Sequence, residues 1–318
     1  MCFWLSAWSG ISLSADHSTM EFFDYFARLQ GFDPEQTPVF LRVMTFVVPL
    51  FIIIFFTCWI IVKVRKLIKT IRHVTRGIRV RENSALTPDE VRAVAVGALY
   101  AYQQGGYVDV PDLDLDKSRL DTILSEWWDI TDRESAVDTA DYLSEAPSQS
   151  ILPLVYSGFK AQDANEGVRI ITDTVNGIFE ASNLPDKDKK VRANGLTVRA
   201  CEYMSNLRSQ LNALKADGII SSESDIMRLG VVAWDAGRLN FVARAAMQKG
   251  YLTPEECQEY IGRAYGMAKG AGFRSWRDFA DSYMLGRTMW NGQSNMAGLA
   301  QDLLENPSSP WVRFPWQP

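Results

Sequence analysis

Residues 43–62 of this 318-residue chain read VMTFVVPLFIIIFFTCWIIV, a stretch of twenty residues without a charge. A helix needs about twenty apolar residues to cross the hydrocarbon core of a bilayer. A helix of that length in a soluble core would show a polar stripe, which residues 51–61 lack. The stretch therefore predicts one transmembrane helix, so that the chain is a single-pass membrane protein.

The segment that follows, residues 63–84, is a basic linker. Its first nineteen residues contain no Asp or Glu and eight basic residues: Lys63, Arg65, Lys66, Lys69, Arg72, Arg76, Arg79 and Arg81. Positive residues next to a membrane span stay on the cytoplasmic side. We therefore expect residues 1–42 to form a short extracytoplasmic tail and the rest of the chain to lie in the cytoplasm.

The basic linker has two interpretations. One is a topology signal that also attracts the anionic headgroups of the bilayer. In that case, the residues in contact with the membrane surface are Lys63, Arg65, Lys66, Lys69, Arg72 and Arg76. The alternative is a specific site for a lipid or a nucleic acid on the same residues.

The rest of the chain is acidic. Ten of the 33 basic and six of the 38 acidic residues lie before residue 85, which leaves 23 basic and 32 acidic residues and a net charge of −9. Nonspecific nucleic-acid binding requires a basic surface, and this balance argues against it. We expect no nucleic-acid partner.

Cysteine and histidine are scarce. The chain has four widely separated cysteines, Cys2, Cys58, Cys201 and Cys257. Their spacing fits neither a disulfide framework nor a zinc site. The two histidines, His17 and His73, precede the main domain, so imidazole bases, histidine-activated nucleophiles and histidine-ligated metals are excluded there. We expect no cofactor.

No standard catalytic signature occurs in the sequence. The glycine-rich residues 266–272, GMAKGAG, lack the ending of a phosphate-binding loop and close a helical pattern instead of following a strand. A nucleophile elbow, a kinase motif set and a dinucleotide fingerprint are also absent from the sequence. The catalytic residues stay unknown, and these observations argue against an enzyme.

Three alternating aspartates resemble the opening of a calcium loop. Asp112, Asp114 and Asp116 have the required spacing, but Lys117 occupies the position of the central glycine and Ile123 that of the closing glutamate. We interpret the aspartates as a solvated loop and expect no metal site.

Capping signals and apolar spacings predict one all-α domain over residues 85–305, with roughly 8–10 helices. The stretches TPDE at 87–90 and TPEE at 253–256 are capping boxes with proline at the first helical position. Apolar residues recur at spacings of three and four through 168–178, 200–214 and 224–249. Residues 306–318, with four prolines and two tryptophans, are expected to form an extended tail that folding does not need.

Charged residues on apolar helix faces mark a candidate site. A helical wheel of residues 224–249 places Arg238 in the middle of the apolar face, with Asp235 beside it. Because an unpaired buried charge is strongly unfavourable, we expect Arg238 to pair with Asp235. The other expected members of this network are Asp129, Arg287, Trp128, Trp234 and Trp276.

The network is open to three interpretations. It is a buried ion-pair lattice that fixes the register of the helices, or a pocket whose arginines hold an anionic small molecule while an aspartate serves as acid or base. The third is a groove for a protein partner. An open concavity that contains Asp235, Arg238 and Arg287 would favour the anion pocket.

Several of these residues resemble a known family. The stretch WDAGR at 234–238 and the stretch WDI at 128–130 occur together with Asp132 and Arg133. Further positions that carry the resemblance are Arg244, Gly250, Tyr251, Thr253, Glu255, Glu256, Tyr260, Ser275, Trp276, Phe279, Tyr283, Gly286, Arg287 and Trp290. Over roughly residues 86–291 the chain resembles the bacterial domain of unknown function 1266. The resemblance implies one α-helical domain and a bacterial origin, and no activity or residue role.

The sequence thus predicts a cytoplasmic α-helical domain tethered to the bacterial inner membrane. Its expected partners are the anionic lipid bilayer and a protein that the domain binds as an interaction or regulatory module. The first alternative is an enzyme or sensor with an anionic small molecule in the Asp/Arg/Trp pocket. A further alternative is an effector or immunity protein of bacterial competition.

Overall fold

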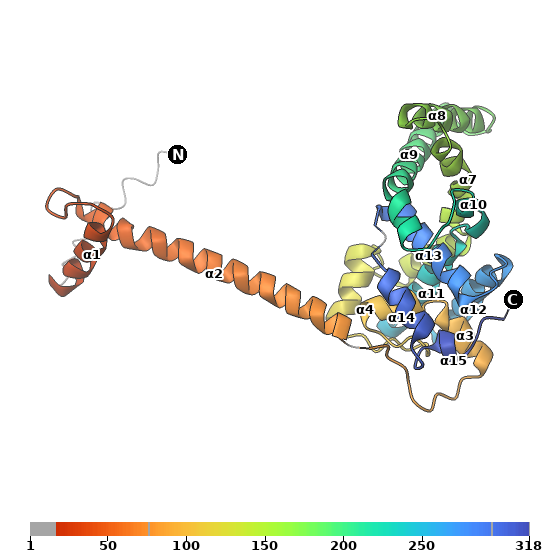
Figure 1. The fold of residues 1–318 in the computed structure, drawn as a ribbon, viewed down its shortest axis with the longest axis horizontal. Coiled ribbons are helices and arrows are strands. Elements are labelled where there is room, and N and C mark those ends of the chain that lie inside the picture. The colour runs from red at the N-terminus through yellow and green to blue at the C-terminus, as the bar shows by residue number, and fades with distance from the viewer. Residues whose placement is uncertain (1–16, 76, 294, 318) are drawn as a thin grey trace. The chain divides into compact units, whose positions relative to one another are not determined.

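The computed structural model describes residues 17–75, 77–293 and 295–317, which are mostly helical (Figure 1). They belong to two compact units, Met1–Thr75 and Arg76–Pro318. Within the described residues, β-type backbone pairing occurs only as an isolated bridge between Arg79 and Tyr107. The predicted all-α fold is confirmed.

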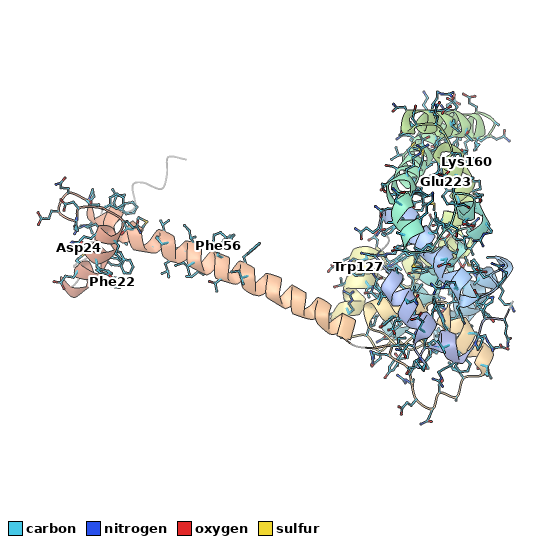
Figure 2. The ribbon with its side chains drawn as sticks, in the orientation of Figure 1. Phe22, Asp24, Phe56, Trp127, Lys160 and Glu223 are labelled. Carbon is cyan, nitrogen blue, oxygen red and sulfur yellow. The ribbon has the colours of Figure 1, made fainter. Side chains whose placement is uncertain are left out.

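The first unit consists of two helices, α1 (His17–Leu29) and α2 (Val39–Thr75). The part of α2 over Val39–Thr57 is long and apolar enough to cross a membrane, with a mean hydropathy of 2.6. Its side chains are largely exposed, and Phe56 points outward from the helix in Figure 2. The side chains of residues 61–76 lie outside the described part of the structure, and so do the expected surface contacts of Lys63, Arg65, Lys66, Lys69, Arg72 and Arg76.

The described residues of the second unit form thirteen α-helices and one π-helical segment. These are α3 (Pro88–Ala95), α4 (Ala98–Gln104), α5 (Lys117–Asp121), η1 (Thr122–Trp127), α6 (Arg133–Ser144), α7 (Pro147–Phe159), α8 (Ala164–Glu180), α9 (Asp186–Ala216), α10 (Asp225–Leu229), α11 (Val232–Lys249), α12 (Pro254–Gly270), α13 (Trp276–Asn291), α14 (Ala297–Glu305) and α15 (Pro310–Arg313). Three of them, α5, α10 and α15, have only four or five residues. Helices this short show no periodicity in sequence.

Helix α11 is the centre of the second unit. Every residue from Ala233 to Ala246 is buried, and the helix packs against α12, α13, α6, α4 and α7 (Figure 1). Glycine allows α13 to approach closely, because a Cβ atom at Gly286 would lie 2.4 Å from the Cβ of Trp234. Helix α8 and the adjoining parts of α7 and α9 extend away from this centre (Figure 1).

The C-terminal segment is folded, and the prediction of an extended tail is wrong. Trp311 of α15 and Trp316 are only 3% and 8% exposed. The indole of Trp311 stacks on Trp276 with ring centroids 5.0 Å apart, and its Nε1 donates a 2.9 Å hydrogen bond to the carbonyl oxygen of Ala95. The prolines of the tail prevent a long helix, but they do not prevent its tryptophans from entering the core.

The second unit also begins earlier than residue 85. Ile78 and Val80 pack against the core, and the backbone N–H of Val108 donates a 3.0 Å hydrogen bond to the carbonyl oxygen of Arg79. The end of the basic linker is therefore part of the folded unit.

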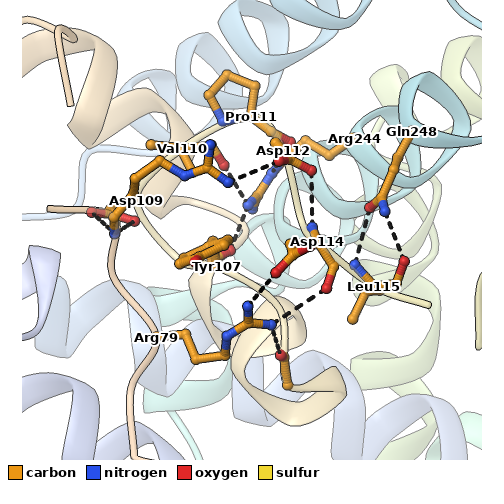
Figure 3. Close-up of polar contacts among 12 residues, drawn as sticks. Arg79, Tyr107, Asp109, Val110, Pro111, Asp112, Asp114, Leu115, Arg244 and Gln248 are labelled. Atoms are coloured by element: carbon orange, nitrogen blue, oxygen red, sulfur yellow. Dashed lines mark hydrogen bonds and ion pairs between the residues drawn. The ribbon is translucent and has the colours of Figure 1, made fainter. Parts of the chain in front are cut away.

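Two arginines of that linker bind the aspartate loop (Figure 3). The guanidinium groups of Arg79 and Arg81 lie 4.3 and 4.7 Å from the ring centroid of Tyr107. Arg79 forms an ion pair with Asp114, and Arg81 forms one with Asp112 at 2.9 Å. Asp114 and Asp116 are exposed as expected, and Asp112 is half-buried. Asp112 and Asp114 are paired with arginines of the predicted linker, and Asp116 caps α5.

Arg244 of α11 holds the same loop. Its side chain is completely buried and donates hydrogen bonds of 2.6, 2.7 and 3.2 Å to the carbonyl oxygens of Tyr107, Val110 and Pro111 (Figure 3). Carbonyl acceptors thus offset part of the cost of burying this charge, while its Nη1 has no hydrogen-bond partner among the described residues. Burial lowers the pKa of Arg244 to about 10, which leaves it protonated at neutral pH.

The first and last segments of the second unit adjoin. Nε of Arg92 donates a 2.9 Å hydrogen bond to the carbonyl oxygen of Pro315. Residues 80–84 and Leu86 line a pocket of about 410 Å³ together with Arg313 and Phe314. The C-terminal tail therefore lies next to residues 80–86, a segment near the start of the second unit.

Candidate functional site

The predicted pair of Asp235 and Arg238 forms in the middle of α11. Asp235 is completely buried, Arg238 is 9% exposed, and Nη2 of Arg238 donates to Oδ1 of Asp235. The same nitrogen donates a 3.1 Å hydrogen bond to Oγ of Ser148, and Nε donates a longer one of 3.4 Å to the carbonyl oxygen of Trp234. The guanidinium group is therefore fixed on one side.

The second oxygen of Asp235 caps another helix. Oδ2 accepts hydrogen bonds from the backbone N–H groups of Ser148 and Gln149, at 2.8 and 3.3 Å. These amides belong to the first turn of α7, whose N-cap residue Ala146 has no side chain that can accept a hydrogen bond. A carboxylate from α11 thus accepts the hydrogen bonds of the first turn of α7, in place of an N-cap side chain.

Two of the predicted tryptophans surround Arg238. Its guanidinium carbon lies 4.7 Å from the ring centroid of Trp234 and 5.7 Å from that of Trp128. Both distances are within the range of cation–π attraction. Nε1 of Trp128 donates a 3.1 Å hydrogen bond to the hydroxyl of Tyr100, which holds that indole in place.

Arg238 lines a pocket of about 630 Å³, which we call the Arg238 pocket. The lining comes from α6, α7, α9, α11 and α13, and consists of Tyr142, Glu145, Pro147, Ser148, Ser150, Ile151, Leu196, Arg199, Tyr203, Arg238 and Trp290. Five of these residues, Tyr142, Glu145, Ser150, Arg199 and Trp290, are exposed, so the pocket is open to solvent.

Two arginines supply donors without protein partners in this pocket. Among the described residues, no protein group accepts a hydrogen bond from Nη1 of Arg238. The exposed side chain of Arg199, on α9, likewise has no hydrogen bond or ion pair within the described part of the chain. The pocket therefore presents guanidinium N–H groups from two different helices.

Tyrosine and tryptophan complete the pocket wall. Burial raises the pKa of Tyr203, so its hydroxyl stays neutral and able to donate a hydrogen bond. Trp290 is 45% exposed and its ring centroid lies 5.7 Å from that of Trp234. Arg199, Tyr203 and Trp290 also line a neighbouring pocket of about 680 Å³ along α9.

Asp129 is not part of the Arg238 network, contrary to the prediction. The residue is exposed and has a φ of 55°, in the left-handed region, just after η1. Within the described residues, no ion pair joins it to Arg238. The turn after the π-helical segment directs Trp128 inward and leaves Asp129 in solvent, which no helical wheel of that segment could show.

Arg287 and Trp276 also lie apart from the predicted pair. Arg287 is half-buried and donates a 3.3 Å hydrogen bond to Oδ1 of Asn295. Burial raises the pKa of Tyr100, and Arg238 and Arg287 partly offset that effect, so both arginines are within electrostatic reach of this hydroxyl. Trp276 belongs to the aromatic cluster of the C-terminal tail, where it stacks on Trp311.

Sequence reasoning missed the residues of α6 and α9 that complete the pocket. Arg199, Tyr203 and Tyr142 lie beside apolar stripes that pack the core, and their pattern is that of a solvent-facing helix surface. The packing of α9 against α7 and α13 brings Arg199 and Tyr203 opposite Arg238, and the packing of α6 against α11 does the same for Tyr142. No local signal in the sequence marks them.

Comparison with protein families identifies a match over most of the second unit. The family described as "Protein of unknown function (DUF1266)" matches residues 123–316, which include the Arg238 pocket and the buried tail. Helices α3 and α4 and the loop held by Arg79 and Arg81 precede the matched range. No curated protein and no solved structure matches the chain.

Proposed function

Since the chain belongs to the DUF1266 family, whose description records no activity, we propose its function from the site: a membrane-tethered domain that binds an anionic ligand in the Arg238 pocket. The observation that carries this proposal is the partnerless Nη1 of Arg238 in an open pocket. A guanidinium group fixed on one side and unpaired on the other is suited to a carboxylate or phosphate group.

The charges of the pocket support an anion as the ligand. Arg199 and Arg238 face a single acidic lining residue, Glu145. The carboxylate of Asp235 already accepts hydrogen bonds from Arg238, Ser148 and Gln149, so its charge is satisfied within the protein. A ligand with one or two negative charges would therefore meet two cations and the hydroxyl of Tyr203.

The position of Asp235 favours binding over acid–base catalysis. This carboxylate is completely buried and does not line the Arg238 pocket. A general acid or base must come within hydrogen-bond reach of the substrate proton. We therefore propose a binding or sensing role for the site.

Arg199→Ala tests the ligand site. The substitution removes one of two charged donors and is expected to weaken binding of a phosphate- or carboxylate-bearing metabolite about 10-fold or more. Because Arg199 is exposed and unpaired, the stability of the ligand-free protein should change by less than about 0.5 kcal/mol. Thermal melts with and without a metabolite panel, followed by calorimetric titration of the best compound, measure both effects.

Arg192→Ala is the matched control, since Arg192 is also an exposed arginine of α9 but does not line the pocket. Arg199→Lys keeps the charge without the fork of donors and should give intermediate affinity. Equal affinity of the wild type and the Arg199→Ala variant would refute the site.

The same proposal places the pocket at the cytoplasmic face of a bacterial inner membrane. It rests on the apolar part of α2 and on the basic residues 63–81, which favour a cytoplasmic C-terminus. A C-terminal fluorescent reporter should be active in cells, and a phosphatase that works only in the periplasm should be inactive at the same position. Replacing Lys63, Arg65, Lys66, Lys69 and Arg72 by glutamine should weaken this preference. A strongly active phosphatase on the unchanged chain would reverse the orientation.

A protein-binding role is the second candidate, and exposed apolar residues on α8 and α9 favour it. Val168, Ile178 and Val191 are 42%, 54% and 66% exposed. Replacement of Ile178 and Val191 by serine separates the two candidates. Loss of a specific partner with an intact metabolite response supports the protein-binding role, whereas the ligand role predicts that only the Arg199 substitution matters.

A further inference from the structure

Helix α1 packs back on the start of α2. Its Ala27 is completely buried, and Asp24 forms a 2.7 Å ion pair with Nη1 of Arg42 on α2. Nε2 of Gln30 donates a 2.7 Å hydrogen bond to the carbonyl oxygen of Thr45. Figure 2 shows Asp24 and Phe22 on this short helix. Polar contacts at Arg42 and Thr45, about one helical turn apart on α2, therefore hold α1 against α2.

These contacts indicate where the hydrocarbon part of α2 begins. A charged residue within the membrane core is unfavourable even when it is paired, so the Asp24–Arg42 pair is expected outside that core. Between Thr45 and Lys63 lie seventeen residues, 46–62, without a charge. At about 1.5 Å per residue they span about 25 Å, close to the shortest length that crosses a bilayer. The boundary therefore falls near Thr45, next to α1.

Helix α1 exposes an apolar face at this level. Tyr25 and Leu29 are four residues apart on one face and are 60% and 64% exposed, and Phe32, just after the helix, is 48% exposed. The charged residues Asp24, Arg28 and Glu21 form a strip beside this face, and Glu21, one turn before Tyr25, lies at the border between the two. A helix with one aromatic face and one charged face is typical of segments that lie in the membrane interface.

We propose that α1 is an interfacial helix, which lies in the headgroup region of the outer leaflet with Tyr25, Leu29 and Phe32 turned toward the acyl chains. The inference rests on the membrane tether proposed above and names the bilayer surface as the partner of this face. Continuity supports the bilayer over a second copy of the chain, because α1 is packed on the helix that would enter the membrane at the same level. The Asp24–Arg42 pair then sets the depth at which the span begins.

Fluorescent labelling of the full chain in liposomes tests this arrangement. In a variant whose native cysteines are replaced by alanine, Leu29→Cys and, as the matched control, Arg28→Cys each carry an environment-sensitive dye. The expected depth of an interfacial apolar face is about 5–10 Å below the headgroups. The dye at residue 29 should therefore be blue-shifted and quenched mainly by nitroxide lipids, and the dye at residue 28 mainly by an aqueous quencher.

Flotation of the liposomes tests the membrane tether separately from the interfacial role of α1. If the unlabelled chain does not float with the lipid, the tether itself is wrong. If it floats and the dye at residue 29 is as accessible to the aqueous quencher as the dye at residue 28, the tether holds and the interfacial role of α1 is refuted. A third outcome is that the dye at residue 29 is protected from both quenchers, and that this protection disappears when the protein is diluted into excess lipid. That result would assign the face to a second copy of the chain and would also refute the inference.

Discussion

Asp235→Ala is expected to lower the free energy of unfolding of the second unit by about 3–5 kcal/mol, because it leaves a buried charge without its partner. Arg238 is 9% exposed, and Asp235 is the acceptor that neutralises it. The substitution also removes the acceptor for the backbone N–H groups of Ser148 and Gln149 at the start of α7. Both losses act in the folded state, so they should add to each other.

Urea unfolding followed by circular dichroism, on a fragment of residues 77–318, measures this loss. The double variant Asp235→Ala and Arg238→Met should recover part of it, since no buried charge is then left unpaired. The recovery should be incomplete because the first turn of α7 still lacks its acceptor. Asp129→Asn is the control, since Asp129 is exposed and asparagine tolerates its positive φ. A change below about 0.5 kcal/mol for Asp235→Ala, the size usual for surface substitutions, would contradict the structural role of the pair.

Trp311→Ala is expected to cost about 3–5 kcal/mol as well, by the removal of a large buried aromatic side chain. The indole is 3% exposed, stacks on Trp276 and donates a hydrogen bond to Ala95. Removal of the whole tail should have a larger effect, because Trp276 and Phe279 then become exposed to water.

Two fragments make this prediction measurable. Residues 77–318 should be soluble and helical without detergent, since this range contains a complete core and its capping boxes. Residues 77–306 should melt at a much lower temperature or aggregate. Val312→Ala serves as the control for Trp311→Ala, because Val312 is the next residue in the chain and its side chain is 39% exposed. Equal melting temperatures of the two fragments would show that the tail is dispensable after all.

Local signals in the sequence were sufficient for the fold class and for one pair of the site. The capping boxes at Thr87 and Thr253 are formed as predicted. The pair of Asp235 and Arg238 was also predictable, because both residues lie on one helix and an unpaired buried arginine is too unfavourable to persist. Each of these predictions depends on residues a few positions apart.

The rest of the site depends on contacts between distant segments. Arg199 faces Arg238 only because α9 packs beside α7 and α13, and Asp129 leaves the network only because of the turn after η1. The tail was interpreted from its composition, whereas its decisive partner, Ala95, is 216 residues away in sequence. Periodicity and composition contain no information about such partners.

The meeting of the first and last segments of the second unit also determines how the molecule can be re-engineered. Arg92 contacts Pro315, and residues 80–84 share a pocket with Arg313 and Phe314, so the chain enters and leaves the unit at one place. Ends that lie this close tolerate circular permutation. A short glycine-rich joint between them would let new ends be opened at residues 181–185, between α8 and α9. A tag attached at the present C-terminus, by contrast, will crowd residues 80–84, which share a pocket with Arg313 and Phe314.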